Sequence, residues 1–181
     1  MIKNEHFCNW NNMPLNLSRL KVLIAEDNSH MRVMVREVLI HFGVSTIQEC
    51  KDGSDALTLL KNWQPDIIFM DWMMEPMDGL EFTRTIRMDP TSPNPYIPII
   101  MLTGHTELHR IFEARDAGVT EFLAKPVTAN GVYARIKSVI ENPRPFIKTD
   151  RYLGPSRRRR QEHVGAVNRR KTPPDDTCLA I

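Results

Sequence analysis

The sequence predicts an α/β fold in which a doubly wound sheet of five parallel strands is flanked by five helices. Five short segments, most of them apolar runs, alternate along the chain with five longer segments whose apolar residues recur at helical spacing. Continuous apolar runs are typical of strands buried on both faces of a parallel sheet. Strands that alternate with helices require right-handed crossovers, which place helices on both faces of the sheet.

The expected elements follow each other in strict alternation. The strands, each with an apolar centre, are expected at residues 21–25, 44–49, 66–70, 99–102 and 120–124. The helices, each with apolar residues three and four positions apart, are expected at residues 29–42, 53–63, 79–88, 106–117 and 128–141.

Capping and turn residues bound the first elements of this series. Val22-Leu23-Ile24-Ala25 forms the first apolar run, and Asn28 or Ser29 can cap the helix that follows it. Gly43 comes directly after that helix and is a usual helix stop. The second helix is expected to begin at Gly53 and presents leucines at helical spacing.

Proline and glycine bound the later elements. The third strand follows Pro65, and a loop with Asp78-Gly79 leads into the third helix. Four prolines fall between residues 89 and 98, a density that excludes a helix there, so this segment is a loop before the fourth strand. Gly118 separates the fourth helix from the fifth strand.

Charge divides the chain into a folded part and a tail. Residues 143–181 hold ten Lys and Arg against four Asp and Glu, whereas the preceding part is mildly acidic and the whole chain carries +2. We therefore expect a leader at 1–19, one domain at 20–142, and a basic, largely disordered tail at 143–181.

The sequence also limits where the protein works. It contains no apolar stretch of the ~20 residues that a membrane helix needs and no signal-peptide pattern at its start. Its three cysteines, Cys8, Cys50 and Cys178, form neither a metal-binding spacing nor a disulfide framework. We expect a cytoplasmic protein without membrane association.

Charged and hydroxyl side chains occur where the first, third, fourth and fifth strands end. These residues are Glu26 and Asp27, Asp71, Thr103, and Lys125. The carboxyl ends of parallel strands lie at one edge of the sheet, where such folds bind their ligands. Three crowded carboxylates repel each other unless a cation lies between them, and oxygen ligands suit Mg²⁺. Taken singly, Asp27 could cap a helix, Asp71 could begin a turn and Lys125 could be solvated, but their joint placement favours a site.

Five segments together resemble the receiver domain of two-component response regulators, the CheY-like fold. They are Leu23-Ile24-Ala25-Glu26-Asp27-Asn28, Asp66-Ile67-Ile68-Phe69-Met70-Asp71, Met77-Asp78-Gly79-Leu80-Glu81, Ile99-Ile100-Met101-Leu102-Thr103-Gly104 and Phe122-Leu123-Ala124-Lys125-Pro126. The resemblance covers residues 20–142 and implies a flavodoxin-like sheet with strand order 2-1-3-4-5.

The resemblance implies a phosphoacceptor and a magnesium site. Asp71 would accept a phosphoryl group from a phosphohistidine. Asp27 and Asp71 would bind Mg²⁺ directly, the backbone carbonyl of Met73 would be a third protein ligand, and Glu26 would act through a metal-bound water. Such a division suits phosphoryl transfer, which depends on positioning and charge neutralisation.

The resemblance also implies roles at the ends of the fourth and fifth strands. Lys125 would pair with Asp71 and then with a phosphoryl oxygen, while the Thr103 hydroxyl would donate to that group. The bond between Lys125 and Pro126 would be cis. Thr103 and Phe122 would form the switch, although Phe122 could equally be a plain packing residue.

One part of the chain departs from the family pattern. Receivers usually carry proline four residues after the acceptor, but this chain has Glu75 there and Pro76 next. The loop can therefore follow another path, which affects the expected coordination by Met73. His105 lies two residues after the threonine, where it would tune the lifetime of the phosphoryl group, or it is an ordinary surface histidine.

The predicted function is signalling rather than catalysis on an external substrate. A histidine kinase or histidine phosphotransfer protein would donate the phosphoryl group, and an unidentified protein target would bind the phosphorylated receiver. The alternative is a nucleic-acid or acidic-surface binder that uses Arg157–Arg160 and is modulated by phosphorylation. A haloacid-dehalogenase-type phosphatase is excluded because it needs a second Asp where Met73 stands.

Overall fold

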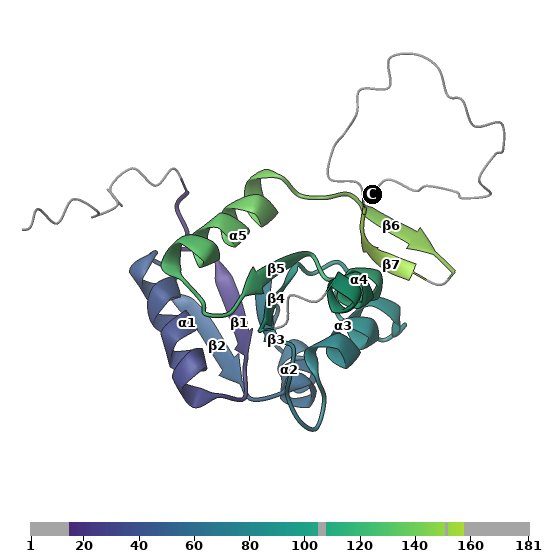
Figure 1. Cartoon of the computed structure of the whole chain (residues 1–181), viewed down its shortest axis with the longest axis horizontal. Coiled ribbons are helices and arrows are strands. Elements are labelled where there is room, and N and C mark those ends of the chain that lie inside the picture. The colour runs from purple at the N-terminus through teal and green to yellow at the C-terminus, as the bar shows by residue number, and fades with distance from the viewer. Residues whose placement is uncertain (1–14, 105–107, 151, 158–181) are drawn as a thin grey trace, which may run out of the picture.

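The computed structural model describes residues 15–104, 108–150 and 152–157. Its centre is a parallel sheet of five strands in the order β2-β1-β3-β4-β5 (Figure 1). The strands are β1 (Lys21–Ala25), β2 (Thr46–Cys50), β3 (Ile67–Asp71), β4 (Ile99–Thr103) and β5 (Glu121–Ala124). The helices are α1 (Ser29–His41), α2 (Gly53–Leu60), α3 (Gly79–Met88), α4 (Leu108–Ala117) and α5 (Ala129–Glu141). The predicted fold class and strand order are confirmed.

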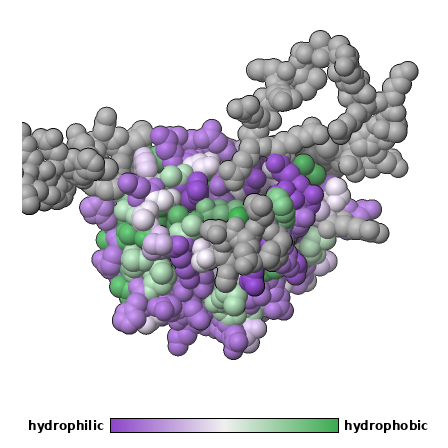
Figure 2. Space-filling model, in the orientation of Figure 1, coloured by the Kyte–Doolittle hydropathy of each residue, from purple (hydrophilic) through white to green (hydrophobic). Residues whose placement is uncertain are grey.

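Helices cover both faces of this sheet and enclose two apolar layers. One layer lies beneath α2, α3 and α4 and includes Leu60, Phe82 and Ala114. The other lies beneath α1 and α5 and includes Leu39 and Ile136. The side chains of β3 and β4 are buried on both faces, as their continuous apolar runs predict. The outer surface is mostly hydrophilic in the view of Figure 2.

Hydrogen-bond partners account for the local differences from the predicted boundaries. β3 and β4 extend by one residue, to Asp71 and Thr103, because these residues still pair with Leu102 and Ala124 in the neighbouring strands. The predicted second helix ends early, at Leu60, where turn hydrogen bonds replace the helical pattern. Of the predicted helix 106–117, the part from Leu108 is helical and 106–107 lie outside the described residues.

The predicted boundary between the leader and the domain, after residue 19, is wrong. Leu17 is only 2% exposed and packs in the layer beneath α1 and α5. The hydroxyl of Ser45 donates to the carbonyl of Ser18, which attaches this segment to the loop before β2. The folded unit therefore begins before residue 20, because one buried leucine anchors the chain there.

The expectation of a largely disordered tail is wrong for its first part. Residues Phe146–Thr149 (β6) and Tyr152–Pro155 (β7) form an antiparallel hairpin that lies beside α3 and α4 (Figure 1). Charge alone suggested disorder, but Leu153 is buried and Gly154 lies close against Gly118. Residues 158–181 lie outside the described part of the chain.

None of the helices in the described ranges is long and apolar enough to cross a membrane.

Candidate functional site

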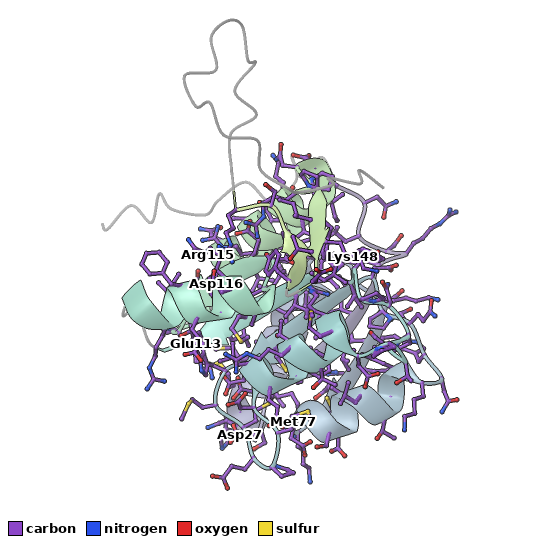
Figure 3. All side chains as sticks on the ribbon, turned by 90° about the vertical axis from the view of Figure 1, so that its right-hand side faces the viewer. Asp27, Met77, Glu113, Arg115, Asp116 and Lys148 are labelled. Atoms are coloured by element: carbon purple, nitrogen blue, oxygen red, sulfur yellow. The ribbon has the colours of Figure 1, made fainter. Side chains whose placement is uncertain are left out.

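The sheet register brings the predicted site residues to one edge. Ala25 pairs with Met70, and Asp71 pairs with Leu102, so the residues that end β1 and β3 lie side by side. Thr103 ends β4 opposite Ala124, which directly precedes Lys125. Figure 3 shows Asp27 at the end of the molecule opposite Lys148 of the hairpin.

Three carboxylates converge at this edge. One ligand oxygen from each of Glu26, Asp27 and Asp71 lies within 4.8 Å of the other two. Glu26 is fully buried, Asp71 is 4% exposed and Asp27 is exposed to solvent. The cluster therefore has two buried carboxylates and one that is open to solvent.

Lys125 joins two of these carboxylates. Its Nζ lies 2.7 Å from Oδ1 of Asp71 and 2.9 Å from Oε2 of Glu26. The Asp71 Oδ1 atom also accepts a hydrogen bond from the backbone N–H of Trp72 at 2.8 Å. Trp72 itself is buried in the layer beneath α2, α3 and α4, directly after the acceptor candidate in the chain.

Burial dominates the electrostatics of this cluster. It raises the pKa of Asp71 and the pKa of Glu26, although the Lys125 ammonium opposes both shifts. Burial alone would lower the pKa of Lys125, but hydrogen bonds and charge from Asp71 and Glu26 outweigh it and raise that pKa. The lysine thus stays protonated and offsets one of the three negative charges.

The remaining charge and the ligand types fit a divalent cation. When all three carboxyl groups are ionised, one ammonium leaves two uncompensated negative charges. All three side chains offer hard oxygen ligands of the kind that Mg²⁺ prefers. Glu26 Oε2 is buried, and the Lys125 ammonium at 2.9 Å is its partner among the described residues. That ammonium is shared with Asp71, so the cluster is suited to a further cationic group.

The loop after β3 places the remaining candidates of that region. Met73 is 57% exposed and Glu75 is also exposed, and both lie in the loop that follows Asp71. The Glu75–Pro76 peptide bond is cis, which the sequence did not indicate, and so is Lys125–Pro126, which the resemblance implied. The N–H of Gly79 donates to the carbonyl of Trp72 and closes the loop.

The two switch candidates lie on adjacent strands. Thr103 is 4% exposed at the end of β4. Phe122 in β5 is partly buried against the layer beneath α2, α3 and α4, and its carbonyl accepts a hydrogen bond from Nε of Arg135 at 2.6 Å. His105 lies outside the described residues.

One residue that contacts the carboxyl edge of the sheet, Arg32, was not predicted from the sequence. Nη1 of Arg32 in α1 donates to the backbone carbonyl of Glu26 at 2.6 Å. Arg32 lies one turn into the helix that begins after the acidic pair, a position that could have drawn attention to it.

Comparisons with known proteins agree with this geometry. A family model described as "Response regulator receiver domain" matches residues 22–137. The chain is 34% identical over 122 residues to "Chemotaxis protein CheY-3" of Vibrio cholerae, covering 67% of this chain and 92% of that protein. It is 32% identical over 122 residues to "Chemotaxis protein CheY" of Pseudomonas aeruginosa, covering 67% of this chain and 97% of that protein.

Solved structures show the same similarity. The chemotaxis response regulator CheY4 of Vibrio cholerae matches with a TM-score of 0.61 at 31% identity, covering 66% of this chain and 98% of that one. The receiver domain of a sensor histidine kinase from Pseudomonas aeruginosa matches with a TM-score of 0.61 at 25% identity, covering 68% of this chain and 98% of that one. That structure has a magnesium ion coordinated in its active site cleft.

Proposed function

Because the chain belongs to the response regulator receiver domain family of two-component signalling, we propose that Asp71 is its phosphoacceptor and that phosphorylation controls binding to a protein target. The observation that carries this proposal is the contact of Lys125 with Asp71 inside a cluster of three carboxylates. We propose no reaction on an external substrate. The donor would be a histidine kinase or a histidine phosphotransfer protein.

The contacts of Asp71 suit a nucleophile. Oδ1 is engaged by the Lys125 ammonium and by the N–H of Trp72, whereas no donor among the described residues reaches Oδ2. A carboxylate oxygen of Asp71 would form the new bond to phosphorus, while the bond from phosphorus to the donor's imidazole nitrogen breaks and that nitrogen keeps the electron pair. Lys125 would then follow the developing charge from the carboxylate to a phosphoryl oxygen.

Glu26, Asp27 and Asp71 would hold Mg²⁺, with the carbonyl of Met73 as a further ligand and Glu26 acting through water. When bound, the ion supplies positive charge that neutralises the acidic cluster and the incoming phosphoryl oxygens. Thr103, at the end of the neighbouring strand, would donate its hydroxyl to the phosphoryl group. Movement of Thr103 with Phe122 would carry the change to the face formed by α4, β5 and α5.

Intact-mass spectrometry after incubation with Mg²⁺ and phosphoramidate tests the proposal. The wild-type protein should gain one phosphoryl group and the Asp71→Asn variant none. Asp66→Asn is a matched control, since Asp66 directly precedes the same strand at its opposite end and accepts a hydrogen bond there from the N–H of Lys21. Equal labelling of the Asp71→Asn variant, or no labelling of the wild type with any small phosphodonor, would refute the assignment.

The alternative proposal, binding of nucleic acid or an acidic surface through Arg157–Arg160, has less support. Arg157 is already paired with Asp116 at 3.1 Å and lies over the ring of Tyr152. The other three arginines lie outside the described residues. Nucleic-acid binding that falls steeply with salt and is lost on removal of residues 158–181 would favour this alternative.

A further inference from the structure

We propose that Arg32 is a positioning residue for the acidic pair: by holding the carbonyl of Glu26, it sets the affinity of the site for Mg²⁺. The inference rests on the proposed function, because it assigns Arg32 a role at the same cation site. The contact that carries it is the hydrogen bond of 2.6 Å from Arg32 Nη1 to the Glu26 carbonyl oxygen.

The Glu26 carbonyl lies where a contact can affect the placement of both acidic side chains. The peptide group that contains the Glu26 carbonyl is the one that links Glu26 to Asp27, and it lies just beyond the last residue of β1. The soft torsions on either side of that peptide plane are ψ of Glu26 and φ of Asp27, and a change in either one alters how the two carboxylates are placed relative to each other. Holding the plane therefore orients two of the three groups in the cluster.

Other partners hold the rest of the segment between β1 and α1, and the Glu26 carbonyl accepts its hydrogen bond from Arg32. The N–H of Glu26 donates to the carbonyl of Cys50 in β2 at 3.2 Å. The side chain of Asn28 accepts from the N–H groups of His30 and Met31 and so caps α1. The N–H of Asn28 also donates to Oε1 of Glu26 at 3.4 Å, so it holds the carboxylate rather than the peptide group. None of these contacts engages the Glu26 carbonyl, which accepts its hydrogen bond from Arg32.

Arg32 is itself held in place. Its side chain is 16% exposed, and its Nε lies 3.3 Å from Oε2 of Glu49 in β2. The guanidinium thus connects α1, the end of β1 and the end of β2. Partners that orient metal ligands in this way commonly change metal affinity by about 10- to 100-fold when they are removed.

Arg36 offers a matched control on the same helix. Its Nε pairs with Oε1 of the same Glu49 at 3.1 Å, and its other ion pair among the described residues is with Glu37, not with the acidic pair. Loss of either arginine removes one positive charge and one ion pair with Glu49. Only loss of Arg32 removes the hydrogen bond to the Glu26 carbonyl.

A pure charge effect and a positioning effect predict opposite changes in Mg²⁺ affinity when Arg32 is removed, so the measurement distinguishes them. If Arg32 acted only as a nearby positive charge, its removal would strengthen binding of a divalent cation, because like charges repel. If Arg32 orients the carboxylates, its removal weakens binding. Lysine keeps the charge but lacks the planar fork that contacts two acceptors, so Arg32→Lys should weaken binding as well.

The experiment is a titration of the full-length protein with Mg²⁺, followed by tryptophan fluorescence and by calorimetry. We expect the Kd of Arg32→Met to rise about tenfold and that of Arg32→Lys to rise by a smaller factor. Arg36→Met should bind as tightly as the wild type or slightly more tightly. Thermal unfolding identifies any variant that does not fold. If Arg32→Met does not fold, the Mg²⁺ affinity of Arg32→Lys is compared with that of the wild type instead.

The outcomes separate the two proposals. An Arg32→Met variant that binds Mg²⁺ as tightly as Arg36→Met overturns the positioning role and leaves the phosphoacceptor proposal intact. A wild-type protein that takes up phosphoryl groups without binding Mg²⁺ overturns the cation part of the proposed function and the role of Arg32 with it.

Discussion

Replacement of Arg87 by methionine should destabilise the protein strongly, although Arg87 lies far from the acidic cluster in the chain. Arg87 is 2% exposed, and its guanidinium donates to the carbonyls of Pro95 at 2.7 Å, Ile97 at 2.8 Å and Gly118 at 3.1 Å. It also lies 5.2 Å from the ring centroid of Phe146 in the hairpin. The described structure shows no carboxylate paired with it.

The magnitude follows from these contacts. Hydrogen bonds from a charged donor contribute about 1.5–3 kcal/mol each, so three of them represent a gross loss of about 4–9 kcal/mol. Methionine returns part of this loss because it has no charge to desolvate. Burial lowers the pKa of Arg87 to about 9, which shows that desolvation opposes the charged form, yet the side chain stays protonated at neutral pH. We therefore expect a net loss near the lower end, about 4 kcal/mol.

Urea unfolding followed by circular dichroism measures this difference. Arg84→Met is the matched control, since Arg84 lies in the same helix, is 55% exposed and forms a single ion pair with Glu113. Exposed pairs contribute at most about 1 kcal/mol, so the control should change little. If Arg87→Met were as stable as Arg84→Met, the carbonyl contacts would not hold α3 to the loop before β4 and to the turn after α4 as described.

Three further predictions concern the hairpin, the loop and the buried thiol. Truncation after Asn142 should lower the free energy of unfolding by about 3 kcal/mol, because it exposes the surface that the hairpin covers, whereas truncation after Arg157 should not; urea unfolding of both variants decides this. Gly79→Ala should reduce phosphoryl labelling at least tenfold, because the added Cβ would overlap the carbonyl oxygen of Asp71; unchanged labelling by intact mass would contradict this. Burial raises the pKa of Cys50 from 9.0 to about 12, so iodoacetamide at pH 8 should modify it only after unfolding, and rapid labelling of the native protein would contradict the burial. Because this pKa lies above the unfolded value, the contribution of the thiol to stability is present below pH 9 and is lost as the pH rises from about 9 to about 12.

Local sequence signals were sufficient for the strands and for most helix boundaries. The run Ile99–Leu102 could only be a buried strand, and Asp78 in front of Gly79 marked the start of α3. Where the prediction failed, at the start of the folded unit and at the hairpin, the deciding contacts come from elsewhere in the chain. Gly154 and Gly118 approach each other closely, and neither residue indicates its partner in the sequence.

The site divides in the same way. The residue types of the site and their positions at strand ends could be predicted from the sequence, because the carboxyl ends of parallel strands lie at one edge of the sheet. The contact of Lys125 with two carboxylates and the engagement of the Glu26 carbonyl by Arg32 depend on side-chain directions. Such directions follow from packing between elements, which pattern and spacing do not encode.

The amino-acid sequence by itself determined the alternation of strands and helices and the acidic, hydroxyl and basic groups at the strand ends, since both arise from short stretches of chain. Tertiary structure alone decided that Glu26 is buried, that the Lys125 ammonium also contacts Glu26, and that a hairpin beyond α5 covers Arg87. These features require residues as far apart as Glu26 and Lys125 to meet, and only the packed sheet and its helices bring them together.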